Sequence, residues 1–306
     1  MKPRTLLAAA LTLTASAALA ADSNATATFD RTLTVSGTPT LSIATGAGYV
    51  HVSPGADTQV HVIGHVHVSP SWFGADADAR VKQIVASPPI TQSGNTITVA
   101  FPHADSDLFR NVSIDYDVTT PRATALKART GSGGINIAGI DGTVSADSGS
   151  GGIHADGIGP NARLETGSGG IHASNVRGAA ILQTGSGNLE LSLTAAGDVK
   201  AQTGSGSIHI DGLNGGLRAG AGSGTIEVAG NPTSEWRLES GSGGIHLKLA
   251  DAARFSLNAE TGSGSVRVDH PIVMQGALNR HHVLGTVNGG GPTIRATTGS
   301  GDVTIH

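Results

Sequence analysis

Several residue types that often define a protein class are scarce or absent in this chain. Its 306 residues include no cysteine, and only 3% are aromatic. The lack of cysteine excludes disulfide bonds, a cysteine nucleophile and a lipid anchor on cysteine. After the first 20 residues, no apolar run is long enough to span a membrane. We therefore expect a mature chain without a transmembrane segment.

Positive charge is scarce as well. Residues 1–20 open with Lys2 and Arg4, continue as a short apolar stretch and end in Ala18-Leu19-Ala20. This is the pattern of a secretory signal peptide, which predicts an exported protein, periplasmic or secreted. Cleavage after Ala20 removes two basic residues and lowers the formal net charge from −4 to −6. The acidic balance argues against nucleic acid as a partner.

Glycine, in contrast, is abundant and regularly placed. The tripeptide Gly-Ser-Gly follows Thr, Ser or Ala nine times, at spacings of mostly 18 or 19 residues. A fixed period of this length indicates a solenoid, in which each repeat forms one coil and stacks on its neighbour. The first glycines of the nine copies are Gly131, Gly149, Gly167, Gly185, Gly204, Gly222, Gly241, Gly262 and Gly299.

Apolar residues alternate with polar ones on both sides of each Gly-Ser-Gly corner. Positions are counted from the residue just before each corner, such as Thr130. The apolar residues lie four and two positions earlier, as Leu126 and Ala128 do, and five and seven positions later, as Ile135 and Ile137 do. Such a period of two predicts strands with one buried face. No segment shows the pattern of a helix of useful length. The predicted fold is all-β, a single-stranded parallel β-helix or solenoid of about 18–19 residues per coil.

The regular coils do not fill the whole chain. We expect a signal peptide at 1–20, an irregular N-terminal β region and cap at 21–124, and the regular solenoid at 125–306. Residues 41–52 are a degenerate tenth copy of the repeat. A long excursion begins at Asp269, and the last coil follows it with no later segment to cap it. We expect this C-terminal coil edge to allow self-association or to pair with an envelope protein.

Three stretches of the chain resemble the bacterial putative-adhesin family of β-strand-repeat proteins, a domain family of unknown function. They are Val112-Ser-Ile-Asp-Tyr-Asp-Val before Pro121, Leu126-Lys-Ala-Arg-Thr-Gly-Ser-Gly-Gly-Ile135, and residues 285–303. The resemblance covers nearly all of the mature chain. It implies a right-handed β-helix and an exported location, and it supplies no catalytic residues and no cofactor.

One outward column after the corners carries imidazoles and carboxylates. At strand spacing these side chains are a candidate site for a divalent metal ion. The competing interpretation is an ordinary solvated face, since outward positions of half-buried strands are polar by default. The candidate metal ligands are His154, Asp156, His172, Glu190, His209, Asp211, Glu227 and His246.

Two outward columns before the corners carry complementary charge. Arg163 precedes Glu165 by two residues, and Arg237 precedes Glu239 in the same way, so we expect each pair to lie close together on its strand. Exposed pairs of this kind contribute about 0–1 kcal/mol each. The same polar sheet is a candidate face for glycans, although aromatic platforms are nearly absent.

The corner tripeptide does not match a ligand-binding loop. In dinucleotide-binding loops a third glycine and a helix follow, whereas here the third position is occupied by residues such as His154 and a strand follows. Calcium-binding β-rolls need an aspartate where this chain has an apolar residue such as Ile153. We expect the nine serines to form hydrogen bonds with local backbone.

These observations favour an exported, non-enzymatic, adhesin-like binding or scaffold protein of the bacterial envelope. Its partner is an envelope protein or glycan that the sequence does not identify, and no cofactor is expected. One alternative is a carbohydrate-binding or polysaccharide-degrading β-helix enzyme, which would need clustered carboxylates in a groove. Another alternative is a metal-binding surface formed by the outward His/Glu column.

Overall fold

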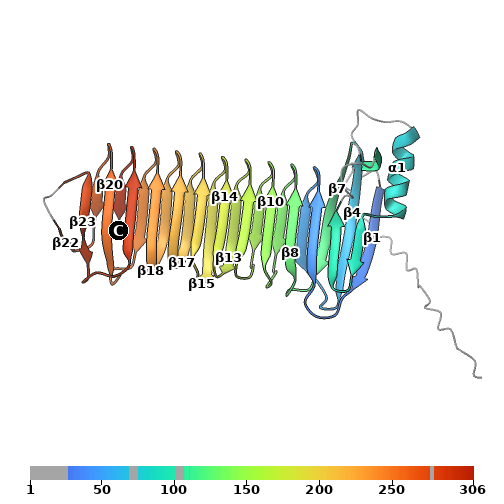
Figure 1. The fold of residues 1–306 in the computed structure, drawn as a ribbon, viewed down its shortest axis with the longest axis horizontal. Helices are drawn as coiled ribbons and strands as arrows, with labels where there is room; N and C mark the ends of the chain where they lie inside the picture. Colours follow the sequence, from blue (N-terminus) through green and yellow to red (C-terminus); the bar gives the residue numbers. More distant parts are fainter. Residues whose placement is uncertain (1–26, 69–74, 101–106, 110, 276–278) are drawn as a thin grey trace, which may run out of the picture.

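The coils stack into one long, flattened column (Figure 1). The computed structural model describes residues 27–68, 75–100, 107–109, 111–275 and 279–306; the predicted signal peptide lies outside these residues. Each coil contributes one strand to each of two walls. We call the wall formed by the strands before the Gly-Ser-Gly corners the pre-corner wall, and the wall formed by the strands after them the post-corner wall.

The pre-corner wall of the middle coils is a set of parallel strands in uniform register. Leu126 pairs with Val144, and Ala162 pairs with Ala180, so residues one period apart occupy equal positions on adjacent strands. Alternate side chains point into the column and are buried. The strands are β8 (Ala125–Thr130), β10 (Val144–Ser148), β12 (Ala162–Thr166), β14 (Ala180–Thr184), β16 (Val199–Thr203) and the C-terminal parts of β17 (Ile208–Ala221) and β18 (Ile226–Ser240).

The post-corner wall repeats this arrangement on the opposite side of the core. Its inward residues are mainly Ile and Leu, and each buried side chain of this size contributes roughly 1.5–3 kcal/mol. Since Ile153 pairs with Ile171, and Ile208 with Ile226, like residues stack along the column. The strands are β9 (Ile135–Ala138), β11 (Ile153–Asp156), β13 (Ile171–Arg177), β15 (Leu189–Ala195), the N-terminal parts of β17 and β18, and β19 (Ile245–Leu249).

At the N-terminal end, the coils do not follow the order of the sequence. In the pre-corner wall, β2 (Thr40–Thr45) pairs with β6 (Thr96–Ala100) on one side and with β8 on the other. In the post-corner wall, β3 (Val50–Pro54) lies between β7 (Val112–Thr120) and β9. The degenerate copy of the repeat is therefore the second coil of the column, although it comes first in the chain.

Antiparallel strands and a helix complete this end. In the post-corner wall, β4 (Gln59–Val68) lies antiparallel between β7 and β1 (Ala27–Thr34). In the pre-corner wall, β5 (Ile90–Ser93) pairs antiparallel with β6. A short 3₁₀ helix, η2 (Asp107–Phe109), precedes β7. Helix α1 (Ala75–Ala86) packs beside β1 at the extreme end of the column (Figure 1).

The helix contradicts the expectation that no segment forms one of useful length. Its buried residues include Val81 and Ile84, and Val85 packs against the core. Three apolar positions in 12 residues are a short amphipathic stripe, so the periodic signal is weak. Ala, Arg, Lys and Gln, which favour helices, supply the rest of the local preference.

The C-terminal end also departs from the order of the sequence. In the pre-corner wall, β24 (Thr293–Thr298) lies between β18 and β20 (Phe255–Thr261). In the post-corner wall, β25 (Val303–Ile305) lies between β19 and β21 (Val266–Val268). Outside β20, β23 (His282–Val287) and β22 (Ile272–Met274) add two antiparallel strands. The last coil in the chain is thus the next-to-last coil in the column.

This order makes the expected open edge at the C-terminal coil wrong. Both strands of that coil have hydrogen-bonded neighbours on each side, so neither is available to pair with another chain. The reason is that the excursion after β21 reverses direction through β22 and β23, and β24 then enters on the inner side of β20. The column instead ends at β22 and β21.

The fold class is all-β and solenoid-like, as the repeat predicts. The right-handed sense implied by the family resemblance stays a prediction. Across the described ranges, we find no helix of the length and apolar character that a membrane crossing requires.

Candidate functional site

The Gly-Ser-Gly corners are held together by a ladder of buried hydroxyl groups. The Thr166 hydroxyl donates a hydrogen bond of 2.8 Å to the Gly151 carbonyl of the neighbouring coil and accepts one of 3.2 Å from the Gly169 amide of its own corner. Each rung therefore satisfies one acceptor and one donor of a tight turn. The residues that make this pair of bonds are Thr130, Ser148, Thr166, Thr184, Thr203, Ser240, Thr261 and Thr298.

The corner serines do not have the role expected from the sequence. All nine side chains, from Ser132 to Ser300, are exposed, and in the described structure none has a hydrogen-bond partner. The residue before each corner supplies the hydroxyl instead. The glycines are required for a steric reason, since a Cβ on Gly187 would lie 2.0 Å from the Gly169 carbonyl oxygen. The corner is therefore a structural element, and the serines form an exposed row of hydroxyls along it.

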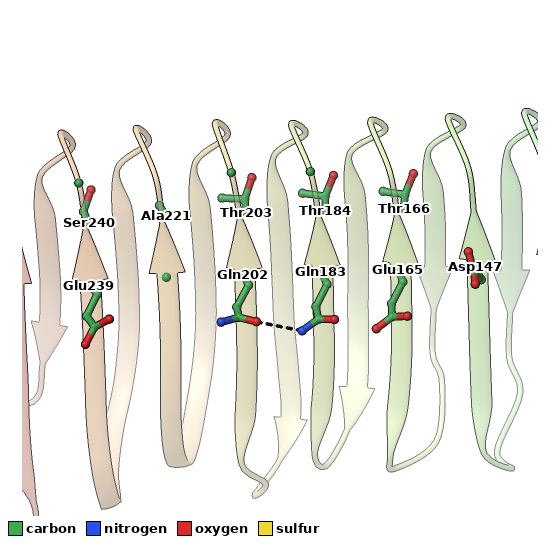
Figure 2. A pocket seen from close by; sticks show the side chains of 14 residues that line it. Asp147, Glu165, Thr166, Gln183, Thr184, Gln202, Thr203, Ala221, Glu239 and Ser240 are labelled. Atoms are coloured by element: carbon green, nitrogen blue, oxygen red, sulfur yellow. Dashed lines mark hydrogen bonds between the residues drawn. The ribbon is translucent and has the colours of Figure 1, made fainter.

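Next to the corners, the outer face of the pre-corner wall is hollowed into a polar groove of about 750 Å³. Figure 2 shows Glu165, Gln183 and Gln202 pointing outward from successive strands along this groove, and Glu239 doing so two strands beyond Gln202. Gln183 Nε2 donates to Gln202 Oε1 at 2.9 Å. Gly220 interrupts the row between Gln202 and Glu239, and nothing lies within 4 Å of where its Cβ would be. This missing side chain leaves open space between amide and carboxylate groups.

The predicted ion pairs in the charged columns are confirmed. Arg163 Nη2 lies 2.5 Å from Glu165 Oε1, and Arg237 Nη2 lies 2.6 Å from Glu239 Oε1. Lys200, Arg218, Arg237 and Arg295 occupy equal positions on four neighbouring strands, so the basic column is continuous there.

Basic side chains of this column line a second groove of about 710 Å³. Lys200 and Arg218 contribute to its wall, and so do the acidic residues Asp198 and Glu235. The groove therefore has mixed charge.

The predicted metal ligands form a column on the opposite, post-corner wall. His154 pairs in register with His172, and His209 with Glu227, while His51 occupies the same position beside Asn136. His172 contacts Glu190, and His209 contacts Glu227 and Asp211. No three His, Asp or Glu side chains converge on a metal-sized site among the residues that the structure describes. The metal site stays a prediction.

Individual members of the column have different partners. His172 Nδ1 lies 2.7 Å from Glu190, whereas both ring nitrogens of His209 are engaged, by Glu227 at 3.3 Å and Asp211 at 2.9 Å. Asp156 accepts hydrogen bonds from Ser174 and Asn175, and these bonds lower the pKa of its carboxyl group. His246 lies one strand beyond Glu227, in register with it.

The pKa of His209 is raised above its ordinary value. Partial burial acts in the opposite direction and lowers it, but the hydrogen bonds and negative charges of Asp211 and Glu227 together outweigh burial. A neutral imidazole donates from one nitrogen, so two carboxylate acceptors on one ring favour the protonated form.

Sequence reasoning missed a second group of histidines near the N-terminal end. His61 lies 2.6 Å from Asp30, and His65 lies 3.0 Å from Asp117, both on the outer face of the post-corner wall. His67 and Asp115 form a similar pair at 2.8 Å. The alternation in residues 59–68 predicts outward histidines, but the aspartates lie on antiparallel strands far away in the sequence. Nothing local indicates this pairing.

These features define a repeat protein with a solenoid-like β fold and two polar faces. Residues 160–306 match the family described as Toastrack DUF4097, a domain family of unknown function. The resemblance predicted from the sequence is thereby confirmed, with the match lying in the C-terminal part of the chain. A search of curated proteins finds no match.

Similar solved structures include a putative adhesin from Bacteroides fragilis, at 13% identity and a TM-score of 0.43 over 92% of this chain and 97% of that one. Another is a putative lipid binding protein from Parabacteroides distasonis, at 12% identity and 0.46 over 92% and 98%. A putative cell adhesion protein from Clostridium sporogenes shows 10% identity and 0.22 over 91% and 99%.

Proposed function

We propose that this chain is an exported, non-enzymatic binding protein of the bacterial envelope. It would present the polar groove of the pre-corner wall to an envelope glycan or protein. The observation that supports this proposal is the groove at Gly220, where the lack of a side chain leaves open space beside Gln202 and Glu239. Amide and carboxylate groups in register on a stacked scaffold provide a repeated, preorganised set of hydrogen-bonding groups. The right-handed, single-stranded β-helix and the periplasmic or secreted location belong to the same proposal.

The distribution of acids favours binding over hydrolysis. Glycosidases place two carboxylates within about 5–9.5 Å of each other across the scissile bond. Glu165 and Glu239 lie on β12 and β18, four strand spacings or roughly 19 Å apart, and each forms an ion pair with an arginine of its own strand. Asp147 and Glu165 are in register on adjacent strands, so they are the pair to test for turnover.

A binding assay on isolated envelope fractions and purified polysaccharides tests the proposal. The probe is the fluorescently labelled chain without residues 1–20. We expect saturable binding that falls roughly ten-fold or more, about 1.4 kcal/mol, in Gln183→Ala/Gln202→Ala. The matched control is Glu190→Ala/Glu227→Ala on the opposite wall, which should bind like the parent. Equal binding by all three proteins contradicts the assignment to this groove.

Two further measurements address export and catalysis. Fractionation of cells that produce the full chain should place it outside the cytoplasm, and a cytoplasmic location would overturn export. Incubation with polysaccharides should leave their length unchanged. Depolymerisation that is abolished by Asp147→Asn and Glu165→Gln would instead establish the enzyme alternative.

A further inference from the structure

The sequence Gly-Gly-Ile-His occurs at three corners and places a histidine beyond a glycine each time. Two of these histidines, His154 and His172, lie on neighbouring strands β11 and β13 in register. The third, His246, has Glu227 and Thr304 as its in-register neighbours. The three Gly-Gly-Ile-His corners therefore provide one adjacent pair of imidazoles and one matched imidazole outside that pair.

We propose that His154 and His172 form a two-imidazole site for a divalent transition-metal ion, with Glu190 as its positioning residue. The two ring centres are 6.1 Å apart. A metal ion about 2.0–2.1 Å from each imidazole nitrogen holds two such ring centres roughly 4.5 Å apart in a cis arrangement and roughly 6.4 Å apart in a trans one. The observed separation lies between these limits, so rotations of the exposed side chains can direct both rings at one ion. Because no third histidine or carboxylate converges on this point among the described residues, water completes the coordination.

The hydrogen bond from His172 to Glu190 supports this site. His172 Nδ1 and Glu190 Oε2 are 2.7 Å apart. When Nδ1 carries the proton, Nε2 keeps its lone pair for a metal ion, and a carboxylate behind the ring makes the imidazole a better ligand. His209 lacks this arrangement because carboxylates engage both of its nitrogens.

The surface around the two rings is also open. A hollow of about 610 Å³ is lined by His154, His172 and Glu190 together with Gly152 and Gly170. His154 Nε2 would lie 3.9 Å from a Cβ at Gly152, so the ring folds back over this glycine. The glycines leave room beside the imidazoles for an ion and its water ligands.

The ligand chemistry selects among metals. Two neutral nitrogens with water oxygens suit the tetragonal geometry of Cu²⁺ or Ni²⁺, and N/O sites bind Cu²⁺ more tightly than Ni²⁺ or Zn²⁺. We therefore expect affinity to fall in the order Cu²⁺, Ni²⁺, Zn²⁺. The site lies on the wall opposite the polar groove. Metal binding can therefore be tested separately from the proposed function.

Titration of the tag-free chain with Cu²⁺, followed by calorimetry and electron paramagnetic resonance, tests this site. We expect the most tightly bound Cu²⁺ ion to be coordinated by two nitrogens. His154→Asn and His172→Asn should each lower its affinity roughly ten-fold or more, and Glu190→Gln should lower it by roughly 10–100-fold. His246→Asn, the matched Gly-Gly-Ile-His control, should leave this affinity unchanged. Circular dichroism without metal checks that each variant is folded.

A gain-of-function variant gives an independent test. Asn136 is in register with His154 on one side and with His51 on the other, so Asn136→His places a third imidazole beside the pair and continues the row to His51. This change should raise the affinity for Cu²⁺ and add a third nitrogen to the resonance spectrum. The proposal is overturned if the His154 and His172 variants bind like the parent, if His246→Asn loses as much affinity as they do, or if Asn136→His gains nothing.

Discussion

The middle of the column and its two ends use the same corner chemistry but assemble their coils in different orders. From β8 to β19, each coil stacks on the one that precedes it in the chain. At each end, one coil takes a place between two others that are joined in sequence. The Thr298 hydroxyl, for example, bonds to the Gly243 carbonyl, and the Thr261 hydroxyl bonds to Gly301. The hydroxyl ladder therefore follows spatial order.

This difference shows how a solenoid protects its ends. Parallel coils expose unpaired strand edges, which invite association with other chains. Here antiparallel strands lie outside the coils in both walls at the N-terminal end, where α1 packs beside β1, and in the pre-corner wall at the C-terminal end. The middle coils are equivalent units, whereas each end depends on a segment that returns from elsewhere in the chain.

Removing the inserted C-terminal coil should have the largest effect. Deleting residues 293–306 removes Ile294, Val303 and Ile305, all fully buried, each contributing roughly 1.5–3 kcal/mol. It also leaves β20 and β21 without their partners on the inner side. We expect hydrogen exchange to show loss of protection throughout β20 and β23, while the middle coils stay protected.

Deletion of one middle coil is the matched control. Removing residues 167–184, one full period, joins Thr166 to the next corner and preserves the register. Stability in such stacks is approximately a sum of repeat and interface terms, so the shortened chain should fold cooperatively. If the two deletions have equal effects, or if β20 remains fully protected without residues 293–306, the contrast between middle and ends is wrong.

Within the middle, two glycines should differ sharply. Gly187→Ala places a Cβ 2.0 Å from the Gly169 carbonyl, where backbone must move, and should destabilise the chain by about 3 kcal/mol. Gly220→Ala meets nothing within 4 Å on an outward strand position and should stabilise it by about 0.5–1 kcal/mol. Urea unfolding of both variants measures the difference. Similar destabilisation by both would show that the contact at the corner is not the cause.

The contrast between middle and ends also explains what the sequence reveals. Alternation around each corner predicts strands, buried faces and the His154–His172 register, because these depend on neighbours one period apart. It does not predict where residues 293–305 insert, since β18 and β20 present the same alternation to them. Pairs such as His65 with Asp117 form between antiparallel strands without a repeat relation. Residue spacing likewise does not predict the side-chain rotamers that bring His172 to Glu190.

The hydroxyl ladder lacks one hydroxyl group, at Ala221. Ala221 occupies the position where other coils have a hydroxyl, so Ala221→Thr should add the two corner hydrogen bonds and raise the free energy of unfolding by about 1 kcal/mol. Thr203→Val removes the bonds to the Gly187 carbonyl and the Gly206 amide and should lower it by about 2 kcal/mol. Chemical denaturation of both variants tests the pair. A stabilising Thr203→Val would contradict the role of the ladder.

The inserted C-terminal coil has the same hydroxyl ladder, so the same substitution can be made there. Thr298→Val should cost as much as Thr203→Val, because its hydroxyl makes the same two bonds, to the Gly243 carbonyl and from the Gly301 amide. A much smaller cost would mean that the inserted coil is held less tightly than a middle coil.

The smallest expected effect concerns pH. Because Asp211 and Glu227 raise the pKa of His209 despite partial burial, folding favours its protonated form. The resulting stability is fully present below the unfolded pKa of about 6.5 and is lost as pH rises through the raised folded pKa. His209→Asn should therefore cost more at pH 5.5–6 than at pH 8, as measured by urea unfolding. The cost stays below about 1 kcal/mol because these side chains are half exposed and screened. Glu227→Gln should lower the pKa of His209 in an NMR titration, and an unchanged pKa would mean that the carboxylate does not act on the ring.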